Sequence, residues 1–327
     1  MPATPLSSAR GGSTRRARVV RVIDAADGIR AFELVPDRDE PLPRWEPGAH
    51  IDLHLPSGAV RQYSLCGEPD AGGYRIAVLE VADGRGGSIE VHRDFREGTV
   101  VEIGGPRNDF RLEDAPAYLF VAGGIGITPI LSMVRSVARA GKPWRLVYGA
   151  RTSAHFAFVD EIDALAAETW GIVEYIPQDR AGHPDLAALV RASRGHAVYC
   201  CGPAPLMDAL GAEMAAQGRA GQLTIERFTA APLVEDPVAA TFEIELAESG
   251  LTLTVAPEES VLEAIRAAGV DVPSSCEMGI CGTCETRVVA GEVDHRDSLL
   301  TDAEREAGDV MMICVSRAAC SRLVLAR

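Results

Sequence analysis

The sequence is poor in aromatic residues, in lysine and in long apolar segments. Each of these absences excludes some structures or functions. Aromatic residues make up 5% of the 327 positions, so the cores must consist mainly of aliphatic side chains. Lysine occurs only at position 142, and we interpret the dominance of arginine as a composition bias rather than as a sign of phosphate or nucleic-acid binding. The longest uncharged run, 117–134, is interrupted by glycines and by Pro129, so we expect no transmembrane helix.

A surplus of positive charge is also missing. The net charge is −15, which argues against nucleic-acid binding because such binding relies on neutralising phosphates. Residues 239–327 contain 16 acidic and 7 basic residues, a balance of −9, which favours docking to a basic partner or simply serves solubility. The pair Arg15-Arg16 is not followed by the apolar stretch of an export signal, so we expect a cytoplasmic protein.

The length of 327 residues predicts two or three domains, and the patterns along the chain change twice. From Arg18 to about Leu112, β-rich runs such as "HIDLHLPSG" and "YRIAVLEV" alternate with turn signals, which indicates an antiparallel barrel or sandwich. From Tyr118 to Phe228, apolar strands alternate with helical segments, which predicts a parallel sheet covered on both faces. Residues 229–238 contain two prolines and no periodicity, so we interpret them as a linker.

The ends of the chain carry more local signals. Residues 1–16 are small, polar and basic, and we expect a loose tail. After the linker, a hairpin is expected to turn at Ser249-Gly250. Ser260 and Glu263 have the spacing of a capping box, which predicts a helix start, and Gly269 is suited to end that helix.

The cysteines give the strongest chemical signal. Cys276, Cys281 and Cys284 follow the spacing C-x4-C-x2-C, and Cys314 comes after 29 further residues, which is the plant-type arrangement for a 2Fe–2S cluster. We expect the fourth ligand to lie on the apolar strand "VMMICVS". Structural zinc is the alternative, but closed zinc sites usually pair their ligands in two short knuckles, and Cys314 has only Cys320 near it.

Two glycines support this interpretation of the cysteine loop. Gly279 and Gly282 permit a positive φ, so that the backbone can wrap tightly around a small cluster. Amide groups brought close to the sulfur atoms stabilise the reduced, more negative cluster.

A glycine turn follows the first strand of the predicted parallel sheet. In "VAGGIGITPI", Gly124 and Gly126 leave backbone N–H groups free to face a phosphate at a helix N-terminus. Thr128 suits the N-cap and Pro129 the first helical position. The strand–turn–helix context predicts a dinucleotide site.

A second turn, Cys201-Gly202-Pro203, ends a later strand of the same pattern. Ligands of parallel sheets sit beyond the carboxyl ends of the strands, so this turn either lines the same crevice or is a packing turn.

The first segment contains two weaker candidates. In "RQYSL", Arg61 can pair with a phosphate, Tyr63 offers a flat face and Ser64 a hydroxyl, although a packed strand would explain them as well. The segment Gly84–Ser88 is a candidate phosphate loop or a hairpin turn.

The order of "RQYSL", "GRGGS", "GGIGITP", "CCGP", "ERF" and "CEMGICGTC" resembles the phthalate dioxygenase reductase family, close to its vanillate demethylase reductase branch. The resemblance runs from about Arg18 to Leu325 and includes "DHRDSLLT" and "MMICVSRA". It implies a multidomain α+β and α/β protein. The implied domains are an antiparallel FMN-binding β-barrel over 17–113, an NAD-binding α/β domain over 114–228, the linker 229–238 and a C-terminal β-grasp 2Fe–2S ferredoxin domain over 239–327.

The resemblance also implies residue roles. Ser64 would act near N5 of the flavin and Cys201 beside the nicotinamide, while Cys200 and Cys320 are interpreted as buried thiols and Cys66 as either flavin-proximal or packed. The implied cofactor-binding residues are Arg61, Tyr63, Ser64, Gly86, Gly87, Ser88 and Phe228 for FMN, and Gly124, Gly126, Thr128, Pro129, Gly202 and Pro203 for the pyridine nucleotide.

The implied cofactors suggest an electron path. NADH releases two electrons as hydride whereas a 2Fe–2S cluster accepts one, and a flavin can divide the pair. Hydride transfer needs stacking rather than an acid–base dyad. The path expected is from NADH through FMN and the cluster to the Rieske-type terminal oxygenase of a two-component mono- or dioxygenase or demethylase system. The alternatives are a stand-alone NADH:acceptor reductase, a reductase for a haem monooxygenase, and a redox sensor without enzymatic activity.

The choice of nucleotide stays open on the residues alone. Arg151 could meet the 2′-phosphate of NADPH, whereas the family resemblance favours NADH.

Overall fold

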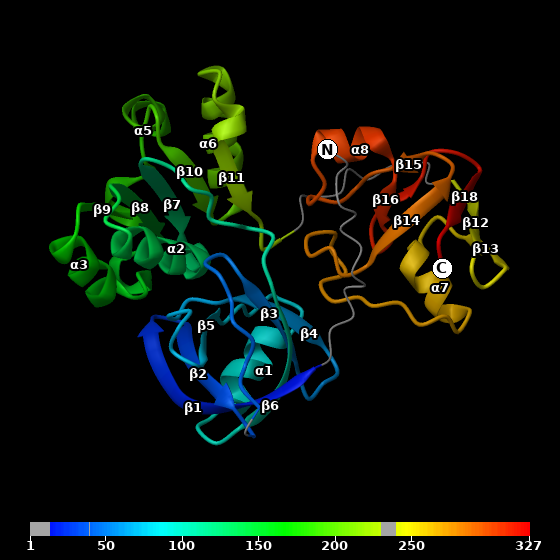
Figure 1. The fold of residues 1–327 in the computed structure, drawn as a ribbon, viewed down its shortest axis with the longest axis horizontal. Helices are drawn as coiled ribbons and strands as arrows, with labels where there is room; N and C mark the ends of the chain where they lie inside the picture. The colour runs from blue at the N-terminus through cyan, green and yellow to red at the C-terminus, as the bar shows by residue number, and fades with distance from the viewer. Residues whose placement is uncertain (1–13, 39, 230–239) are drawn as a thin grey trace. The chain divides into compact units, whose positions relative to one another are not determined.

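The computed structural model describes residues 14–38, 40–229 and 240–327 and falls into two compact units, Ser13–Phe228 and Thr229–Arg327 (Figure 1). Residues 1–13 of the predicted tail and all of the predicted linker except Thr229 lie outside the described residues. Within the described ranges, no helix has the length and apolar character needed to span a bilayer.

The first unit begins with an antiparallel sheet of six strands, which are β1 (Arg15–Ala26), β2 (Ile29–Pro36), β3 (His50–His54), β4 (Val60–Ser64), β5 (Tyr74–Leu79) and β6 (Val100–Arg107). The strand order is β4-β3-β6-β1-β2-β5. Just beyond β4, the amide of Cys66 donates to the carbonyl of Arg75 in β5 at 2.8 Å, so the two outer strands meet as in a barrel. Alternating residues such as Phe32, Leu34 and Ile51 fill the interior and are 0% exposed.

Two local expectations for this sheet are wrong. Strand β1 starts at Arg15, which pairs with Ile103 of β6, so the end of the predicted tail belongs to the sheet. The glycine-rich segment before Ser88 is not a hairpin turn, because it leads into helix α1 (Gly87–Asp94). Gly86 precedes this helix with φ of 78°, a conformation that glycine adopts without strain.

The second sheet of this unit is parallel and has the order β11-β10-β7-β8-β9. Its strands are β7 (Tyr118–Gly123), β8 (Trp144–Ala150), β9 (Gly171–Pro177), β10 (Ala197–Cys201) and β11 (Leu223–Glu226). The connections contain α2 (Ile127–Arg139), α3 (Val159–Glu168), α4 (Gln178–Ala181), α5 (Leu186–Ala192), α6 (Ala204–Ala216) and the 3₁₀ turns η1 (Gly124–Gly126), η2 (Ser153–His155) and η3 (Ala220–Gln222).

Successive residues of β7 point to opposite faces of this sheet. Phe120 and Ala122 pack in the core that holds α2 and α3, whereas Leu119 and Val121 pack in the core that holds α5 and α6. Figure 1 shows these helices around the sheet. This confirms the predicted parallel sheet with helices on both faces. Helices α1 and α5 are not predicted by the sequence patterns.

The second unit contains a mixed sheet of order β13-β12-β18-β14-β16 and a separate pair, β15 and β17. The elements in chain order are β12 (Phe242–Leu246), β13 (Leu251–Val255), α7 (Val261–Ala267), β14 (Glu285–Ala290), β15 (Val293–Asp294), α8 (Asp302–Ala307), β16 (Val310–Met312), β17 (Arg317–Ala318) and β18 (Arg322–Leu325).

Local signals in this unit are largely confirmed. The hairpin β12–β13 turns at Gly250, whose φ is 69°, and α7 begins with the predicted capping box of Ser260 and Glu263. Gly269 follows the helix with φ of 80°. The strand expected to hold Cys314 is shorter than predicted, because β16 ends at Met312 and Cys314 lies in the turn that follows.

Candidate redox centres

The four predicted metal-ligating cysteines come together in the second unit as two pairs. The Sγ atoms of Cys284 and Cys314 are 3.2 Å apart, and Cys276 shares a hydrogen bond with Cys281. All four side chains are buried. Within the described residues, no three His, Cys, Asp or Glu side chains form a group able to hold one metal ion. Two pairs suit a two-iron cluster with two thiolates on each iron better than they suit a single zinc ion.

The cysteine loop has the backbone that a compact cluster requires. Gly279 and Gly282 both have φ of 69°. A Cβ on Gly279 would lie 2.5 Å from a methyl carbon of Val315, so no side chain fits there. The amide of Met278 donates to Sγ of Cys276 at 3.3 Å, which shows that backbone N–H groups reach the sulfur atoms. The loop therefore fits the group that the spacing predicts.

The electrostatics of the pairs favour thiolates. Hydrogen bonds with Cys276 and then with Thr283 lower the pKa of Cys281 to about 5. In the second pair, the hydrogen bond with Cys314 lowers the pKa of Cys284. The same hydrogen bonds raise the pKa of the partner thiols of Cys276 and Cys314. Each pair therefore favours one thiolate, which is the form of cysteine that binds metal.

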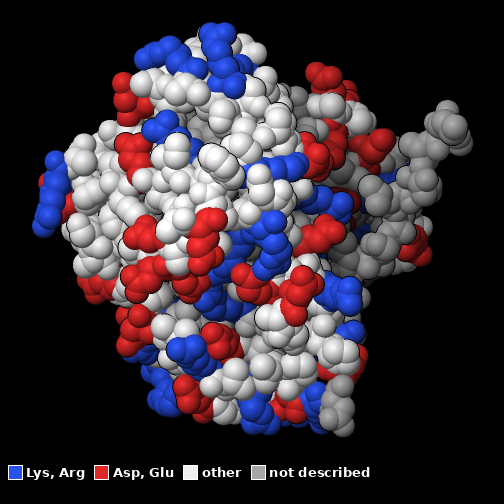
Figure 2. Space-filling view, turned by 60° about the vertical axis from the view of Figure 1, so that its left-hand side comes forward, with Lys and Arg blue, Asp and Glu red and all other residues white. Residues whose placement is uncertain are grey.

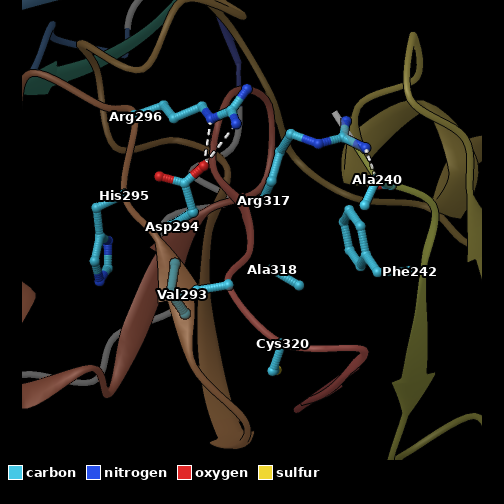
Figure 3. Close-up of a pocket in the computed structure, with 10 residues that line it drawn as sticks. Ala240, Phe242, Val293, Asp294, His295, Arg296, Arg317, Ala318 and Cys320 are labelled. Carbon is cyan, nitrogen blue, oxygen red and sulfur yellow. Dashed lines mark hydrogen bonds and ion pairs between the residues drawn. The ribbon is translucent and has the colours of Figure 1, made fainter. Parts of the chain in front are cut away.

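A cavity of about 420 Å³ lies in the same unit and is drawn in Figure 3. Arg296 pairs with Asp294 at 2.6 Å, and Arg317 donates to the backbone carbonyl groups of Glu259 and Ala256 at 2.7 and 2.9 Å. These charged side chains hold neighbouring loops, and no predicted site residue lines the cavity.

Two cysteines outside the cluster loop differ in their surroundings. Cys320 lines this cavity and is partly exposed, so the expectation that it is buried is wrong. Cys200 is 0% exposed, as expected.

In the first unit, the glycine turn after β7 and the turn after β10 touch each other. A Cβ on Gly126 would lie 2.3 Å from the carbonyl oxygen of Cys201, and one on Gly202 would lie 2.9 Å from Cα of Gly123. Two backbones approach this closely only without side chains. The structure thus brings Gly124, Gly126, Gly202 and Pro203 to one edge of the parallel sheet, beyond the carboxyl ends of its strands.

The start of α2 differs from the expectation by two residues. Gly126 is the N-cap, because the 3₁₀ turn η1 runs directly into the helix at Ile127. Thr128 and Pro129 therefore occupy the second and third helical positions rather than the N-cap and the first. The hydroxyl of Thr128 donates to the carbonyl of Ile125 at 2.9 Å and so braces the turn.

The predicted flavin-phosphate residues also meet. A Cβ on Gly87 would lie 2.6 Å from Nε of Arg61, so the guanidinium group lies against the N-terminus of α1. Arg61 also donates to the carbonyl of Arg85 at 3.1 Å, and the hydroxyl of Ser88 accepts from the amide of Val81 at 3.0 Å. A positive charge beside helical amides is an arrangement that suits a phosphate.

The two predicted catalytic residues converge on a carboxyl group that the motif analysis does not single out. Ser64 at the end of β4 donates to Oε2 of Glu226 at 3.5 Å, and Glu226 at the end of β11 is the register partner of Cys201 in β10. Burial and then Asp109 raise the pKa of Glu226 to about 8. Burial, followed by Glu226, raises the pKa of the Cys201 thiol. Both groups are therefore held neutral near pH 7.

In the sequence, Glu226 belongs to the motif "ERF", and no role is predicted for it. The one signal that points to it is an acidic residue at the carboxyl end of the last parallel strand, where ligands bind.

The remaining aromatic candidates and Cys66 line the core. Burial raises the pKa of Tyr63 to about 12, and Phe228 packs half-buried on the core around α2. Cys66 is 0% exposed in that same core, and burial raises the pKa of its thiol, so packing is the better account of Cys66.

Comparison with known proteins finds two family models and several relatives that match this chain. Residues 244–319 match the 2Fe-2S iron-sulfur cluster binding domain, and residues 120–211 match the oxidoreductase NAD-binding domain. Phenoxybenzoate dioxygenase subunit beta of Ectopseudomonas oleovorans is 42% identical over 94% of this chain and 96% of its own. Vanillate O-demethylase oxidoreductase of Pseudomonas sp. is 41% identical over 92% of this chain and 96% of its own.

Two solved structures are similar over nearly the whole chain. Phthalate dioxygenase reductase, described as modular for electron transfer from pyridine nucleotides to 2Fe–2S, is 37% identical with a TM-score of 0.70 and covers 96% of this chain and 98% of its own. An intact type IV self-sufficient cytochrome P450 monooxygenase is 38% identical with a TM-score of 0.87, and all of this chain matches 43% of that one.

These similarities confirm the predicted family, the fold class and the cofactor set. The chain belongs to the phthalate dioxygenase reductase family and is an NADH-dependent iron–sulfur flavoprotein reductase of the oxygenase-system type, with FMN and a 2Fe–2S cluster as its cofactors.

Proposed function

We propose that this chain passes electrons from NADH through FMN and its 2Fe–2S cluster to a Rieske-type terminal oxygenase in a two-component mono- or dioxygenase or demethylase system. The observation that supports the proposal is that one chain brings together two groups of side chains with different chemistry. One is the group of Ser64, Cys201 and Glu226, which is held neutral beside a glycine turn, and the other is a loop of paired thiols. The first suits hydride and the second single electrons.

The roles of the site residues are part of this proposal. Arg61, Gly86, Gly87 and Ser88 would hold the flavin phosphate, with Tyr63 and Phe228 against the ring. Gly124, Gly126, Thr128, Pro129, Gly202 and Pro203 would hold the pyridine nucleotide, and Cys276, Cys281, Cys284 and Cys314 the cluster. The domain limits that we propose are 17–113, 114–228 and 239–327, joined by 229–238.

The Cys201 thiol and the Glu226 carboxyl group would both be neutral at the proposed hydride site. Cys201 is 0% exposed and protonated, so no thiolate repels the incoming hydride. The neutral carboxyl of Glu226 can hold a proton at Oε2 beside the hydroxyl of Ser64. Flavin supplies the conversion between two-electron and one-electron transfer when it is bound.

An anaerobic absorbance spectrum of the purified protein tests the proposal. Overlapping flavin and iron–sulfur bands that bleach on addition of NADH would support it, and metal analysis that finds zinc without iron would refute it. Slower bleaching with NADPH at equal concentration would support the proposed nucleotide.

Docking is tested separately by salt. The second unit bears a surplus of acidic residues, including α8 with the sequence "DAEREA". We expect added salt to slow reduction of the oxygenase but not of a small dye, because screening weakens attraction between charged surfaces. Equal salt effects on both acceptors would count against docking by charge.

A haem monooxygenase is the second candidate for the acceptor. The specific observation in its favour is the similarity of this whole chain to part of a self-sufficient cytochrome P450. Purified Rieske-type oxygenase and purified cytochrome P450, each supplied with NADH and this chain, would distinguish the candidates by which of the two is reduced faster.

A further inference from the structure

A group of charged side chains joins the two sheets of the first unit. Arg135 of α2 is 7% exposed, and its Nη1 donates to the carbonyl groups of Cys66 at 2.5 Å and Gly67 at 3.1 Å. Arg75 of β5 donates to the same Cys66 carbonyl at 3.0 Å. Glu161 of α3 accepts from Arg75 at 2.7 and 2.9 Å and also from Arg135. We call Arg75, Arg135, Glu161 and the Cys66 carbonyl group the Cys66 clamp.

The clamp lies between segments that lead directly to the two halves of the hydride site. Cys66 follows Ser64 by two residues on the extension of β4, where the flavin side chains are. Arg135 is on the same helix, α2, that begins at the nucleotide turn with Gly126 as its N-cap. Because a helix and a strand end are stiff, a shift at the clamp moves Ser64 relative to Gly126.

The third side of the clamp shows backbone strain. Phe158 precedes α3 with φ of 64°, a conformation that is uncommon for a residue with a bulky side chain. The guanidinium group of Arg75 lies 4.9 Å from the centre of the Phe158 ring. Such strain persists only where surrounding contacts hold it, and the contact with Arg75 of the clamp is one of them, beside packing in the core.

The charge state of the clamp is set by its geometry. Burial by itself would raise the pKa of Glu161, but the hydrogen bonds and charge of Arg75, followed by Arg135, lower it. Charges of both signs are interspersed on the side of the molecule that carries α3, without a large area of one sign (Figure 2). The carboxylate of Glu161 therefore forms ion pairs with the two arginines and is not part of an acidic docking surface.

We propose that Arg135 and Glu161 are positioning residues for hydride transfer, because the Cys66 clamp sets the register between the flavin strand and the nucleotide helix. The proposal rests on the proposed function. The two arginine side chains are 13% and 8% exposed, whereas that of Glu161 is 40% exposed, so the clamp is partly buried. Such ion pairs contribute little net stability, but they can specify a single arrangement. Hydride transfer is sensitive to that arrangement, since a displacement of about 1 Å can cost roughly a hundredfold in rate.

The test uses the holoenzyme with Glu161→Gln, which keeps the shape and removes the charge. We expect the rate of flavin reduction at saturating NADH to fall about tenfold or more, with the KM for NADH changed less than about threefold. Flavin and iron contents should match those of the parent protein. Glu161→Asp, which keeps the charge on a shorter side chain, should recover part of the rate.

The matched control is Glu174→Gln. It removes an ion pair with Arg145, at 2.9 Å, that joins β8 to β9 inside one sheet and spans no interface. Its rate of flavin reduction should equal that of the parent.

A second readout does not depend on turnover. NAD⁺ stacked on reduced flavin absorbs at long wavelength, so the amplitude of this band at saturating NAD⁺ reports their register. We expect a smaller amplitude for Glu161→Gln at an unchanged dissociation constant for NAD⁺.

Two results would refute the positioning role of the clamp, and a third would refute the proposed function on which that role rests. A rate for Glu161→Gln within about twofold of the parent, with a lower unfolding temperature, would make the clamp purely structural. If Glu161→Gln fails to fold, Arg135→Lys takes its place, because lysine keeps the charge but lacks the fork with which Arg135 reaches both Glu161 and the Cys66 carbonyl group. An unchanged rate and an unchanged band in Arg135→Lys would overturn the proposal. A parent protein that does not oxidise NADH would refute the proposed function itself.

Discussion

The two redox sites of this chain are built in opposite ways. The cysteine site takes three of its four thiols from the single loop 276–284, so its chemistry is set by local spacing. The proposed hydride site joins Ser64 to Glu226, which are 162 positions apart and lie on two different sheets. The contrast shows that the residues of one loop can supply most ligands of a metal site, whereas a hydride site depends on how two sheets pack together.

The sites also treat charge differently. Hydrogen bonds lower the pKa of Cys281 to about 5 in the cysteine site, whereas burial raises the pKa of Glu226 to about 8 in the hydride site. A metal cluster needs anionic ligands, whereas hydride transfer benefits from uncharged side chains around the reacting atoms. A substitution confined to one of the two sites should therefore directly impair only one of two steps, either the oxidation of NADH or the export of electrons to a protein acceptor.

The largest expected effect is on the cysteine site. Cys281→Ser should lose most of the iron and reduce electron export to a protein acceptor to background, because serine does not replace the thiolate of this loop. NADH-driven reduction of a small dye should persist, since the hydride site is in the other unit. Iron analysis and the two acceptor assays check this.

Cys320→Ser serves as the control for Cys281→Ser. Cys320 is partly exposed and outside the cluster loop, so its iron content should stay at the parent level. Full iron and full export in Cys281→Ser would overturn the assignment of this loop.

The next effect concerns the contact between the two nucleotide turns. A Cβ at position 126 would lie 2.3 Å from the carbonyl oxygen of Cys201, so Gly126→Ala must push the turns apart. We expect about 1–3 kcal/mol lower stability and a KM for NADH raised about tenfold or more. Denaturant unfolding and steady-state kinetics with a dye measure the two quantities.

The matched control is Gly221→Ala, where a Cβ meets nothing within 4 Å and φ is not positive. This variant should bind NADH as the parent does. If Gly126→Ala behaved like Gly221→Ala, the turns would not form a nucleotide site.

A smaller effect is expected at the flavin phosphate. Arg61→Gln removes the charge that lies against the N-terminus of α1. Charge-assisted hydrogen bonds contribute about 1.5–3 kcal/mol, so FMN should bind about ten- to a hundredfold more weakly. Titration of the flavin-free protein with FMN measures this, and Arg21→Gln, at an exposed arginine of the same sheet, should change nothing.

The smallest effect is a pH dependence of stability at Glu226. Its folded pKa is about 8 against an ordinary value of 4.5, so between these values the folded protein holds a proton that the unfolded chain releases. The free energy of unfolding therefore falls as pH rises from about 4.5 to about 8 and levels off above.

Glu226→Gln should remove that dependence. The residue is only partly exposed, but relaxation of the neighbouring groups around an ionised carboxylate offsets most of the cost of burial, so we expect about 1 kcal/mol, or 2–4 °C in the unfolding temperature. Thermal unfolding of parent and variant at low and high pH measures it. Parallel pH curves for parent and variant would show that the carboxyl group titrates normally.

Much of the fold follows from local patterns. Apolar alternation, the capping box at Ser260 and glycines such as Gly250 and Gly269 act within a few residues, and the structure agrees with them. Errors appear where two elements merge, as in the 3₁₀ turn before α2, which moves the helix start away from Thr128. Helix α1 is missed because its glycine-rich start has a turn-like composition.

The sequence by itself determined the cysteine loop, because ligand spacing and two glycines encode a cluster site without help from distant residues. Only the tertiary structure decided the hydride site. Glu226, the contact between Gly126 and Cys201 and the Cys66 clamp arise where strand ends and helices from separate sheets come together. The physical reason is that backbone spacing acts locally, while burial and charge depend on neighbours that the chain brings together only by folding.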